Sequence, residues 1–350
     1  MDDREIQQLL MRGAIVGMAN GQLCVGWGDA LALESASPSA VSFYAPDFYL
    51  ENKKPWVVFT NNRVVCPSLL VEALKKSPDS VPCSRQFSSL GQEEFFEKFN
   101  FIGKHFDTHV LKKAVPLAWA SSEGSLTADE RKKVLLSALN KGSGSSVYGV
   151  WGVDDGGLLG VTPELLFEWD QARHHLSTMA LAGTRLSASD HSLLDDPKEK
   201  NEHQLVVDAL LEELATYGTP SVSPTYEWNV GTLTHLRTDI TVESKNGLDF
   251  EMLARDLHPT PALGLAPRTV DFHWLKNLDG HMDRARFGAP FGVRWADGSG
   301  RCLVAIRNVQ WVKGKTFLGV GCGVVPESQP SREWQELLNK QLAVKTMLGL

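Results

Sequence analysis

Two strand–turn–strand patterns constrain the fold of this 350-residue chain more than any other feature. In the first, SVYGVWGV at 146–153 is followed by the turn DDGG and then by LLGVTPELLFEW at 158–169. In the second, RCLVAIRNVQWV at 301–312 is followed by the turn KGK and by TFLGVGCGVV at 316–325. The Asp-Gly step supplies the positive φ that a tight hairpin turn requires. Each pattern therefore predicts an antiparallel hairpin.

Helical patterns are interleaved with these strands. Residues 127–142 begin with a capping box, Thr127 with Glu130, and end at Gly142. Asp196 is followed by Pro197 and predicts a helix start, with Gly218 beyond its end. A last helix is predicted at about 331–348, and one more strand at 174–184. Because hairpins outnumber βαβ units, we predict an α+β fold with large, mostly antiparallel sheets flanked by helices.

Charge and cysteine usage exclude several classes of protein. The formal net charge is −7, so neither a basic nucleic-acid footprint nor a polybasic membrane patch is expected. No stretch approaches the ~18–20 apolar residues of a membrane helix, and the first residues lack the pattern of a signal peptide. The five cysteines are odd in number and contain no CxxC pair. We therefore expect a cytoplasmic protein with reduced thiols.

A pair of glutamates lies at the start of the helix that follows Asp196. Glu199 comes three residues after this N-cap residue, where a glutamate can accept from the N–H of the cap. Glu202 is one turn further along and has no such explanation. His203 has no second His or Cys at zinc-ligand spacing. The local pattern leaves a helix cap, a solvated face and a metal site open for this pair.

A second pair with the same spacing begins the last helix. Glu333, Glu336 and Lys340 fall on one stripe, and an exposed Glu336–Lys340 ion pair of ~0.3–0.5 kcal/mol would explain it locally. Four carboxylates from two helix starts would instead suit Mg²⁺, which prefers oxygen ligands and keeps several water molecules. Spacing alone does not decide between these interpretations.

Eight motifs follow one another in the second part of the chain: TPELLF, MALAGTR, KEKNEHQLVVDAL, LTHL, LHPTPALGLAPR, RFGAPFGVRW, LVAIRN and GVGCGVVPESQPSREWQELLNK. In this order they resemble the chorismate-utilising enzymes. This family includes isochorismate synthase, salicylate synthase, anthranilate synthase component I and aminodeoxychorismate synthase component I. The resemblance covers 110–350, whereas residues 1–100 resemble the family weakly, and the whole chain is expected to form one chorismate-binding domain.

The resemblance implies a fold and a metal site. The family fold is a single α+β domain in which two antiparallel sheets pack together and helices surround them. By resemblance, Glu202 and Glu336 hold Mg²⁺ directly or through water, and Glu199 and Glu333 complete the acidic site. The ion would bind the ring carboxylate of chorismate.

The resemblance also implies positions that bind the substrate. Arg307 would hold the enolpyruvyl carboxylate, since a planar guanidinium matches a planar acceptor. The backbone of Gly321 would approach the same carboxylate, and Lys340 would lie at the carboxylate and metal end. The remaining substrate-binding positions that the motifs indicate are Ala182, Gly183, Thr184 and Ala262.

Three further residues would carry the chemistry by resemblance. Lys113 matches the lysine that acts in the family as the base that activates water. If the alignment were shifted by one residue, Lys112 would take this place. Glu164 matches the acid, and each group would need a shifted pKa in a closed cleft. His235 matches a histidine near the leaving hydroxyl.

Sequence differences select a branch of the family. Ala182 replaces the lysine typical of aminodeoxychorismate synthases, VVDALLEEL replaces the VDLxRND-like segment of anthranilate synthases, and Ala262 replaces the threonine of salicylate synthases. These features indicate a Mg²⁺-dependent isochorismate synthase of menaquinone or siderophore biosynthesis, monomeric and without a glutaminase subunit. A salicylate synthase or an anthranilate synthase-like enzyme remains an alternative. A non-catalytic binding protein is a further alternative. It is motivated by Trp119, where the family has an arginine, and by the divergent first 100 residues.

Overall fold

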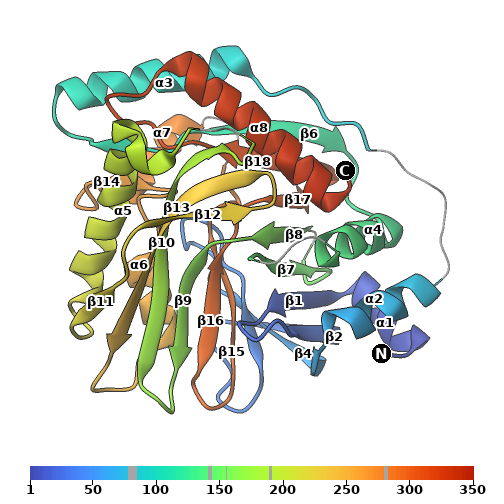
Figure 1. The fold of residues 1–350 in the computed structure, drawn as a ribbon. Helices are drawn as coiled ribbons and strands as arrows, with labels where there is room; N and C mark the ends of the chain where they lie inside the picture. Colours follow the sequence, from blue (N-terminus) through green and yellow to red (C-terminus); the bar gives the residue numbers. More distant parts are fainter. Residues whose placement is uncertain (78–84, 141–143, 155, 189–190, 280–282) are drawn as a thin grey trace.

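The computed structural model describes residues 1–77, 85–140, 144–154, 156–188, 191–279 and 283–350. These residues form the α+β fold that the sequence predicts, with helices on the outer faces of a large sheet (Figure 1). The strands are β1 (Gly13–Gly17), β2 (Leu23–Leu33), β3 (Ser42–Tyr44), β4 (Trp56–Val65), β5 (Lys113–Ala114), β6 (Leu117–Glu123), β7 (Ser146–Trp151), β8 (Gly156–Thr162), β9 (Leu165–Asp170), β10 (His175–Leu186), β11 (Pro220–Val222), β12 (Tyr226–Val230), β13 (Leu233–Glu243), β14 (Leu265–Ala266), β15 (Pro290–Arg294), β16 (Gly300–Val304), β17 (Asn308–Val312) and β18 (Lys315–Gly321). The helices are α1 (Asp3–Met11), α2 (Pro67–Lys76), α3 (Gln92–Asp107), α4 (Ala128–Leu139), α5 (Pro197–Leu214), α6 (Phe250–Leu257), α7 (Lys276–Asp279) and α8 (Pro330–Leu348), with 3₁₀ turns at Leu193–Asp195 and Phe272–Leu275.

Hydrogen bonds join sixteen strands of the described residues into one sheet, and every recorded pairing between strands is antiparallel. The order is β11–β13–β10–β9–β16–β15–β3–β4–β2–β1–β7–β8–β17–β18–β6, with β12 paired to β13. We call strands β9, β10, β11, β12, β13, β15 and β16 the β10 half of the sheet. We call strands β1, β6, β7, β8, β17 and β18 the β8 half. Strands β9, β10, β15 and β16 run crosswise to β1, β7 and β8 in Figure 1. In the strand order, β3, β4 and β2 join the two halves. The family's two packed sheets are thus two halves of one curved sheet here.

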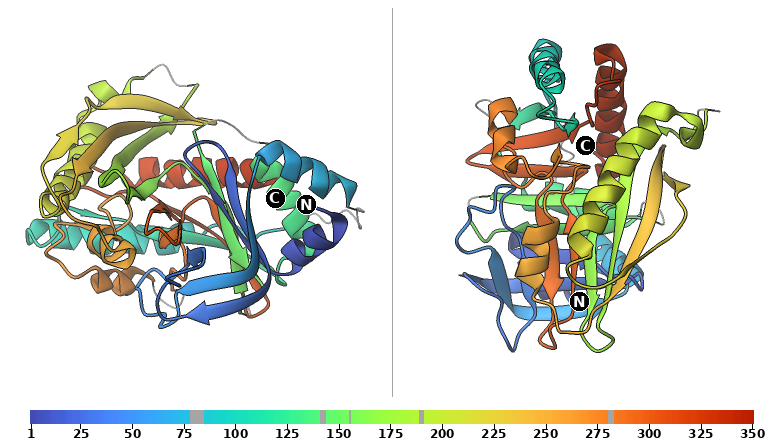
Figure 2. Two further views of the ribbon diagram at one scale, coloured as in Figure 1. Left: turned by 90° about the horizontal axis from the view of Figure 1, so that it is seen from below. Right: turned by 90° about the vertical axis from the view of Figure 1, so that its left-hand side faces the viewer.

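The halves pack face to face over an apolar core. This core includes Val16 of β1, Leu158 of β8, Phe291 of β15 and Leu303 of β16, all buried. Helices α5 and α6 cover the outer face of the β10 half, while α1, α3, α4 and α8 cover that of the β8 half. Both termini lie on the side of the molecule away from α5 (Figure 2). Strands β1–β4 come from the first 100 residues, so this divergent part belongs to the same sheet as the motif-bearing part.

Both predicted hairpins are present, as β7–β8 and β17–β18. One strand of each hairpin, β8 and β17, is shorter than expected, however. The segment 158–169 is interrupted between Thr162 and Leu165, and 301–312 is interrupted between Val304 and Asn308. At both interruptions the chain passes directly from one half of the sheet to the other. We call this line the crease.

Backbone hydrogen bonds hold the crease together. The Val161 N–H donates to the carbonyl of Arg307 at 3.1 Å, and the Val304 N–H donates to the carbonyl of Glu164 at 3.1 Å. Glu164 thus lies opposite Val304 and Arg307 opposite Val161, at the two ends of the irregular segments that run beside each other. The hydrogen-bonding capacity of the backbone is still used there, as buried peptide groups require.

The helix predictions are confirmed with one correction. The Thr127–Glu130 capping box is present at α4, Asp196 caps α5 through the N–H groups of Lys198 and Glu199, and α8 spans Pro330–Leu348. The predicted stop at Gly142 lies outside the described residues. Glu199 does not bond back to Asp196, whose N–H donates to the carbonyl of Leu193, so the capping-box interpretation of Glu199 is wrong. No helix in the described part of the chain is both long and apolar enough to span a membrane.

A buried arginine ties the segments around the crease together. Arg284 is 1% exposed, and its Nε lies 3.0 Å from Asp279 Oδ1. Its two terminal nitrogens donate to the carbonyls of Leu263, at 3.1 Å, and of Val115, at 2.7 Å. The Tyr49 hydroxyl donates to the other oxygen of Asp279. This network fixes the loop before β14 against the segment after β5.

Replacing this arginine is expected to destabilise the protein strongly. Arg284→Met keeps much of the side-chain volume but leaves the Asp279 carboxylate buried without its cation, which typically costs about 3–5 kcal/mol. Urea unfolding followed by tryptophan fluorescence should show a correspondingly lower midpoint. Arg255→Met is the matched control, because the Arg255 side chain is 55% exposed in its pair with Glu251 and should change stability by no more than about 0.5 kcal/mol. Equal effects of the two substitutions would contradict the role of the buried network.

Candidate active site

A cavity lies at the crease, and most of the sequence-predicted site residues line it. They come from β10, β13, β18, α5, α8, the loop before β14 and the two interruptions. A second depression adjoins it at Thr184 and is lined by Glu199, Glu333 and Glu336. The predicted residues that line the main cavity are Glu164, Ala182, Gly183, Thr184, Glu202, His235, Ala262, Arg307, Gly321 and Lys340.

Arg307 and His235 form one end of this cavity. Arg307 adopts a φ of 53°, which is uncommon for a residue with a Cβ and indicates a backbone constrained by its surroundings. It is 8% exposed, and its NH2 lies 2.5 Å from His235 Nε2. Burial lowers the pKa of Arg307 to about 10, so its charge is retained at neutral pH. The interpretation of Arg307 as a solvent-facing strand residue is therefore excluded.

The contacts of His235 define its tautomer. Burial, and next the charge of Arg307, hold its pKa well below the usual 6.5, so the ring is neutral. Nε2 must accept from the guanidinium, which has no acceptor of its own. Nδ1 lies 3.1 Å from both the Gly183 carbonyl and the Thr184 hydroxyl, and it donates there. His235 thus orients the Arg307 guanidinium and leaves its other donors for an anion.

Glu164 is a buried carboxyl group beside this cation. It is 4% exposed, and burial raises its pKa to about 7 against the opposing charges of Lys113, Arg307 and Lys340. Its backbone is fixed on both sides, since its N–H donates to Thr162 Oγ1 at 3.1 Å and its carbonyl accepts in the crease. A carboxyl group with this pKa can act as a proton donor near neutral pH.

Lys113 is the buried member of the Lys112–Lys113 pair, so the register of β5 is the predicted one. Lys112 is exposed, whereas Lys113 is fully buried with its Nζ 3.0 Å from Glu202 Oε1. This contact is an ion pair without a well-directed hydrogen bond among the described residues. Lys113 does not itself line the main cavity but lies behind Glu202.

Gly323 is a site residue that sequence reasoning missed. A Cβ at this position would lie 2.0 Å from Glu202 Oε1 and 2.7 Å from Lys113 Cε. The absence of a side chain at Gly323 is what allows this ion pair to form. The signal in the sequence is the second glycine of GCG, two residues after Gly321.

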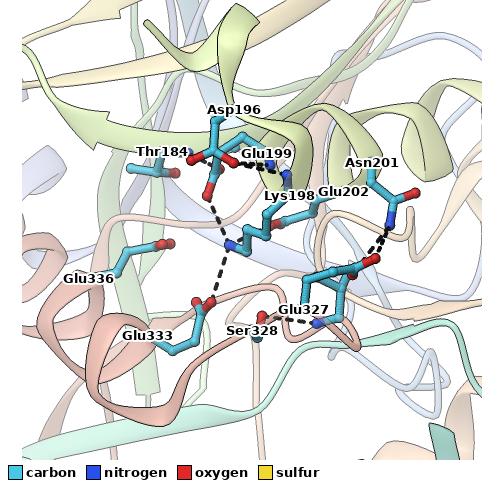
Figure 3. Close-up of polar contacts among 12 residues, drawn as sticks. Thr184, Asp196, Lys198, Glu199, Asn201, Glu202, Glu327, Ser328, Glu333 and Glu336 are labelled. Carbon is cyan, nitrogen blue, oxygen red and sulfur yellow. Dashed lines mark hydrogen bonds and ion pairs between the residues drawn. The ribbon is translucent and has the colours of Figure 1, made fainter. Parts of the chain in front are cut away.

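The four glutamates lie at the other end of the cavity, around a lysine that the sequence analysis did not single out (Figure 3). Lys198 Nζ is 2.9 Å from Glu199 Oε1, 3.2 Å from Glu202 Oε2 and 3.2 Å from Glu333 Oε1. The other oxygen of Glu199 accepts from the Thr184 N–H at 3.0 Å, which joins α5 to β10. We call Glu199, Glu202, Glu333 and Glu336 the acidic cluster.

Glu336 forms the predicted pair with Lys340, at 2.7 Å, but not on an exposed surface. The two side chains are only 17% and 23% exposed, and Lys340 Nζ also donates to the Gly321 carbonyl at 2.9 Å. The interpretation of this pair as a solvated helix face is therefore wrong. Lys340 instead connects the acidic cluster to the strand end that carries Gly321.

Burial and mutual repulsion give the carboxylates of the cluster different pKa values. Burial, and then the charge of Glu202, raise the pKa of Glu199 to about 7. Burial, and then Glu336, raise the pKa of Glu333 to about 7. Although burial opposes it, Lys113 and Lys198 lower the pKa of Glu202 to about 2. Glu202 therefore stays charged at neutral pH.

The donor set of the cluster suits a hard divalent cation, because all four side chains offer oxygen ligands. Glu333 Oε2 is also buried without a well-directed hydrogen bond among the described residues. As they stand, however, no three described His, Cys, Asp or Glu side chains are close enough together to hold an ion. The ammonium of Lys198 lies between them, so the residues fit Mg²⁺ in type, and the carboxylates would have to move closer to one another.

Comparisons with known proteins agree with the motifs. Residues 67–349 match the family model described as chorismate binding enzyme. The chain is 34% identical over 201 residues to the salicylate biosynthesis isochorismate synthase of Pseudomonas aeruginosa, covering 55% of this chain and 42% of that protein. It is 32% identical over 207 residues to isochorismate synthase EntC of Escherichia coli K12, covering 56% and 52%. The aligned region thus spans about half the length of these curated relatives.

Solved structures share the fold over the whole chain. Putative isochorismate synthase DhbC from Bacillus anthracis has a TM-score of 0.81 at 20% identity and covers 100% of both chains. MenF, the menaquinone-specific isochorismate synthase from Escherichia coli, has a TM-score of 0.81 at 17% identity and covers 99% of this chain and 90% of that one. At these identities the likeness establishes the fold alone, and it includes the first 100 residues.

His235 is expected to remain neutral in the folded protein well below pH 6.5. Protonation would place a second cation against Arg307 in a buried position, which burial and repulsion both oppose. Long-range ¹H–¹⁵N correlation spectra should show the Nδ1–H tautomer unchanged down to pH 5.5, with His235→Gln identifying the signal. An imidazole that titrates near pH 6.5 would contradict the assigned Arg307–His235 contact.

Proposed function

The chain belongs to the chorismate binding enzymes, and from this premise we propose that it is a Mg²⁺-dependent isochorismate synthase acting on chorismate. The observation that carries the proposal is the polarity of the cavity. A buried guanidinium lies at one end, a cluster of carboxylates at the other, and a carboxyl group with a pKa of about 7 beside them. A dianionic substrate with one leaving hydroxyl matches these three features.

Binding would use cations at both ends of the cavity. Arg307, held by His235, offers its remaining N–H groups to the enolpyruvyl carboxylate. Lys340, beside Gly321, adds a positive charge next to the acidic cluster. Bound by Glu202 and Glu336, Mg²⁺ would supply the charge that attracts the ring carboxylate. An acidic protein can in this way bind an anion.

The chemistry proposed for the bound ring is an exchange of hydroxyl positions. The oxygen of water bonds to C2, the ring double bond shifts, and the C4–O bond breaks. To act as the base, Lys113 must first lose the proton of its ion pair with Glu202; the neutral amine then takes one proton from the water, and Glu164 gives one proton to the departing hydroxide. Product and substrate are thus isomers. The burial of both groups supports these roles, because a closed site favours proton transfer between positioned groups.

Other activities of the family are less well supported. Ala182 lines the cavity where a lysine nucleophile would be needed for an aminodeoxychorismate synthase. Ala262 also lines it, in place of the threonine that resemblance associates with salicylate synthases. A non-catalytic protein would not require the buried Lys113 and Glu164. We propose a cytoplasmic monomer without a glutaminase subunit, whose product serves menaquinone or siderophore formation.

The product of the purified protein with chorismate and Mg²⁺ is expected to be isochorismate, with little salicylate. Excess EDTA should abolish turnover and added Mg²⁺ should restore it, because the acidic cluster repels a dianion until it is neutralised. Chromatography with mass-spectrometric detection checks both statements. Anthranilate formed on addition of ammonia, or full turnover in EDTA, would contradict the proposal.

Lys113→Ala is expected to lower kcat by ~10²–10⁴-fold, the usual contribution of a general base. KM should change much less, because Arg307 and Lys340 hold the carboxylates. Lys112→Ala is the matched control, since that side chain is exposed next to it and should leave both constants close to wild type. Loss of turnover in Lys112→Ala with an active Lys113→Ala would show that the base has been assigned to the wrong residue.

The pH dependence of kcat/KM is expected to contain a limb from Glu164. Its pKa is raised to about 7, so the proton it must donate is present below that pH and is lost as the pH rises through it. Activity should therefore fall about tenfold per pH unit above the transition. Glu164→Gln should lower kcat by ~10²–10⁴-fold and remove this limb from the residual rate. A limb that persists unchanged in Glu164→Gln belongs to another group and would refute the assignment.

A further inference from the structure

The acidic cluster already contains a cation supplied by the protein itself. Lys198 is the second residue of α5, and its Nζ contacts Glu199 and Glu202 on its own helix. It also contacts Glu333 in the first turn of α8, at 3.2 Å. One side chain therefore bridges the starts of the two helices that carry the acidic cluster (Figure 3).

The ammonium group and a divalent ion would use the same oxygens. Lys198 Nζ keeps Glu199, Glu202 and Glu333 at 2.9–3.2 Å, whereas Mg²⁺ requires oxygens at about 2.0–2.1 Å. Both cations cannot lie among these carboxylates at once, because their charges repel at this separation. Entry of the ion therefore requires the ammonium group to leave.

Lys198 can move out of the acidic cluster, whereas Lys113 cannot. Its side chain is 18% exposed and lines the outer depression together with Asp196, Glu327 and Arg332. Lys113 is fully buried and cannot reach solvent without opening the core. A rotation of the Lys198 side chain toward the depression would release the carboxylates without moving either helix.

We propose that Lys198 is a displaceable internal counter-cation. It holds the acidic cluster assembled in the metal-free enzyme, and it withdraws into the outer depression when Mg²⁺ binds. The inference rests on the Mg²⁺ site of the proposed function and adds to it a role for a residue outside the predicted ligand set. Lys198 acts on the carboxylates and is a positioning residue.

The proposal is tested by metal binding without substrate. Lys198→Met keeps the length of the stem and removes the charge, Lys198→Arg keeps the charge, and Lys200→Met is the matched control on an exposed position of the same helix. Isothermal titration calorimetry measures Mg²⁺ affinity of the substrate-free proteins. Thermal unfolding in EDTA and in saturating Mg²⁺ measures what the ammonium contributes to stability.

Lys198→Met should bind Mg²⁺ at least about tenfold more tightly than wild type, because the ion no longer competes with a charge in contact with its ligands. Its melting temperature in EDTA should be lower than that of wild type, and saturating Mg²⁺ should restore it. Lys198→Arg should bind Mg²⁺ no more tightly than wild type, and Lys200→Met should match wild type in both measurements.

Different failures have different meanings. Unchanged or weaker Mg²⁺ binding by Lys198→Met, when wild type binds the ion, overturns the exchange and leaves the metal site standing. Absence of Mg²⁺ binding by every variant, with chorismate present or absent, overturns the metal site and this inference together. If Lys198→Met folds only when Mg²⁺ is present, that result supports the role of Lys198 in stabilising the metal-free protein. In that case Lys198→Arg tests the exchange, and tighter Mg²⁺ binding by Lys198→Arg than by wild type would overturn the proposed competition between the side-chain charge and the ion.

Discussion

Four carboxylates can be buried at one place in this protein because ammonium groups lie among them. Lys113 and Lys198 contact Glu202 from opposite parts of the chain, and Lys340 contacts Glu336. Isolated, any of these charges would be too costly to bury. Lys198 also contacts Glu333 at 3.2 Å and so links α5, which covers the β10 half, to α8, which covers the β8 half.

The crease determines how the remaining residues reach the cavity. Glu164 and Arg307 are placed where the chain changes from one half of the sheet to the other, and their carbonyls accept the bonds that keep the ladder closed. In a regular strand, successive side chains point to alternate faces of the sheet. Glu164 and Arg307 lie outside regular strands, at the interruptions, and the side chains of both residues line the same cavity.

The sequence predicts the hairpins, the capped helices and the family, because these depend on local pattern and on motif order. It does not predict the crease, since 158–169 and 301–312 look like uninterrupted strands until their partners are known. It misassigns Glu199, whose partner is the N–H of Thr184 on another element. Lys198 was missed for a similar reason, because its contact with Glu333 joins residues far apart in the chain.

The backbone bonds of the crease also bear on how such an enzyme can diversify. The main chain alone makes the bonds of Val161 to Arg307 and of Val304 to Glu164, so the scaffold does not depend on which side chain stands at 164. Position 307 is less free, because its φ of 53° penalises β-branched residues. The proposed proton donor at position 164 can therefore be exchanged in evolution at little cost to folding, whereas the proposed anion-binding position 307 is constrained by backbone shape. New reactions should arise on this scaffold more readily than new kinds of substrate.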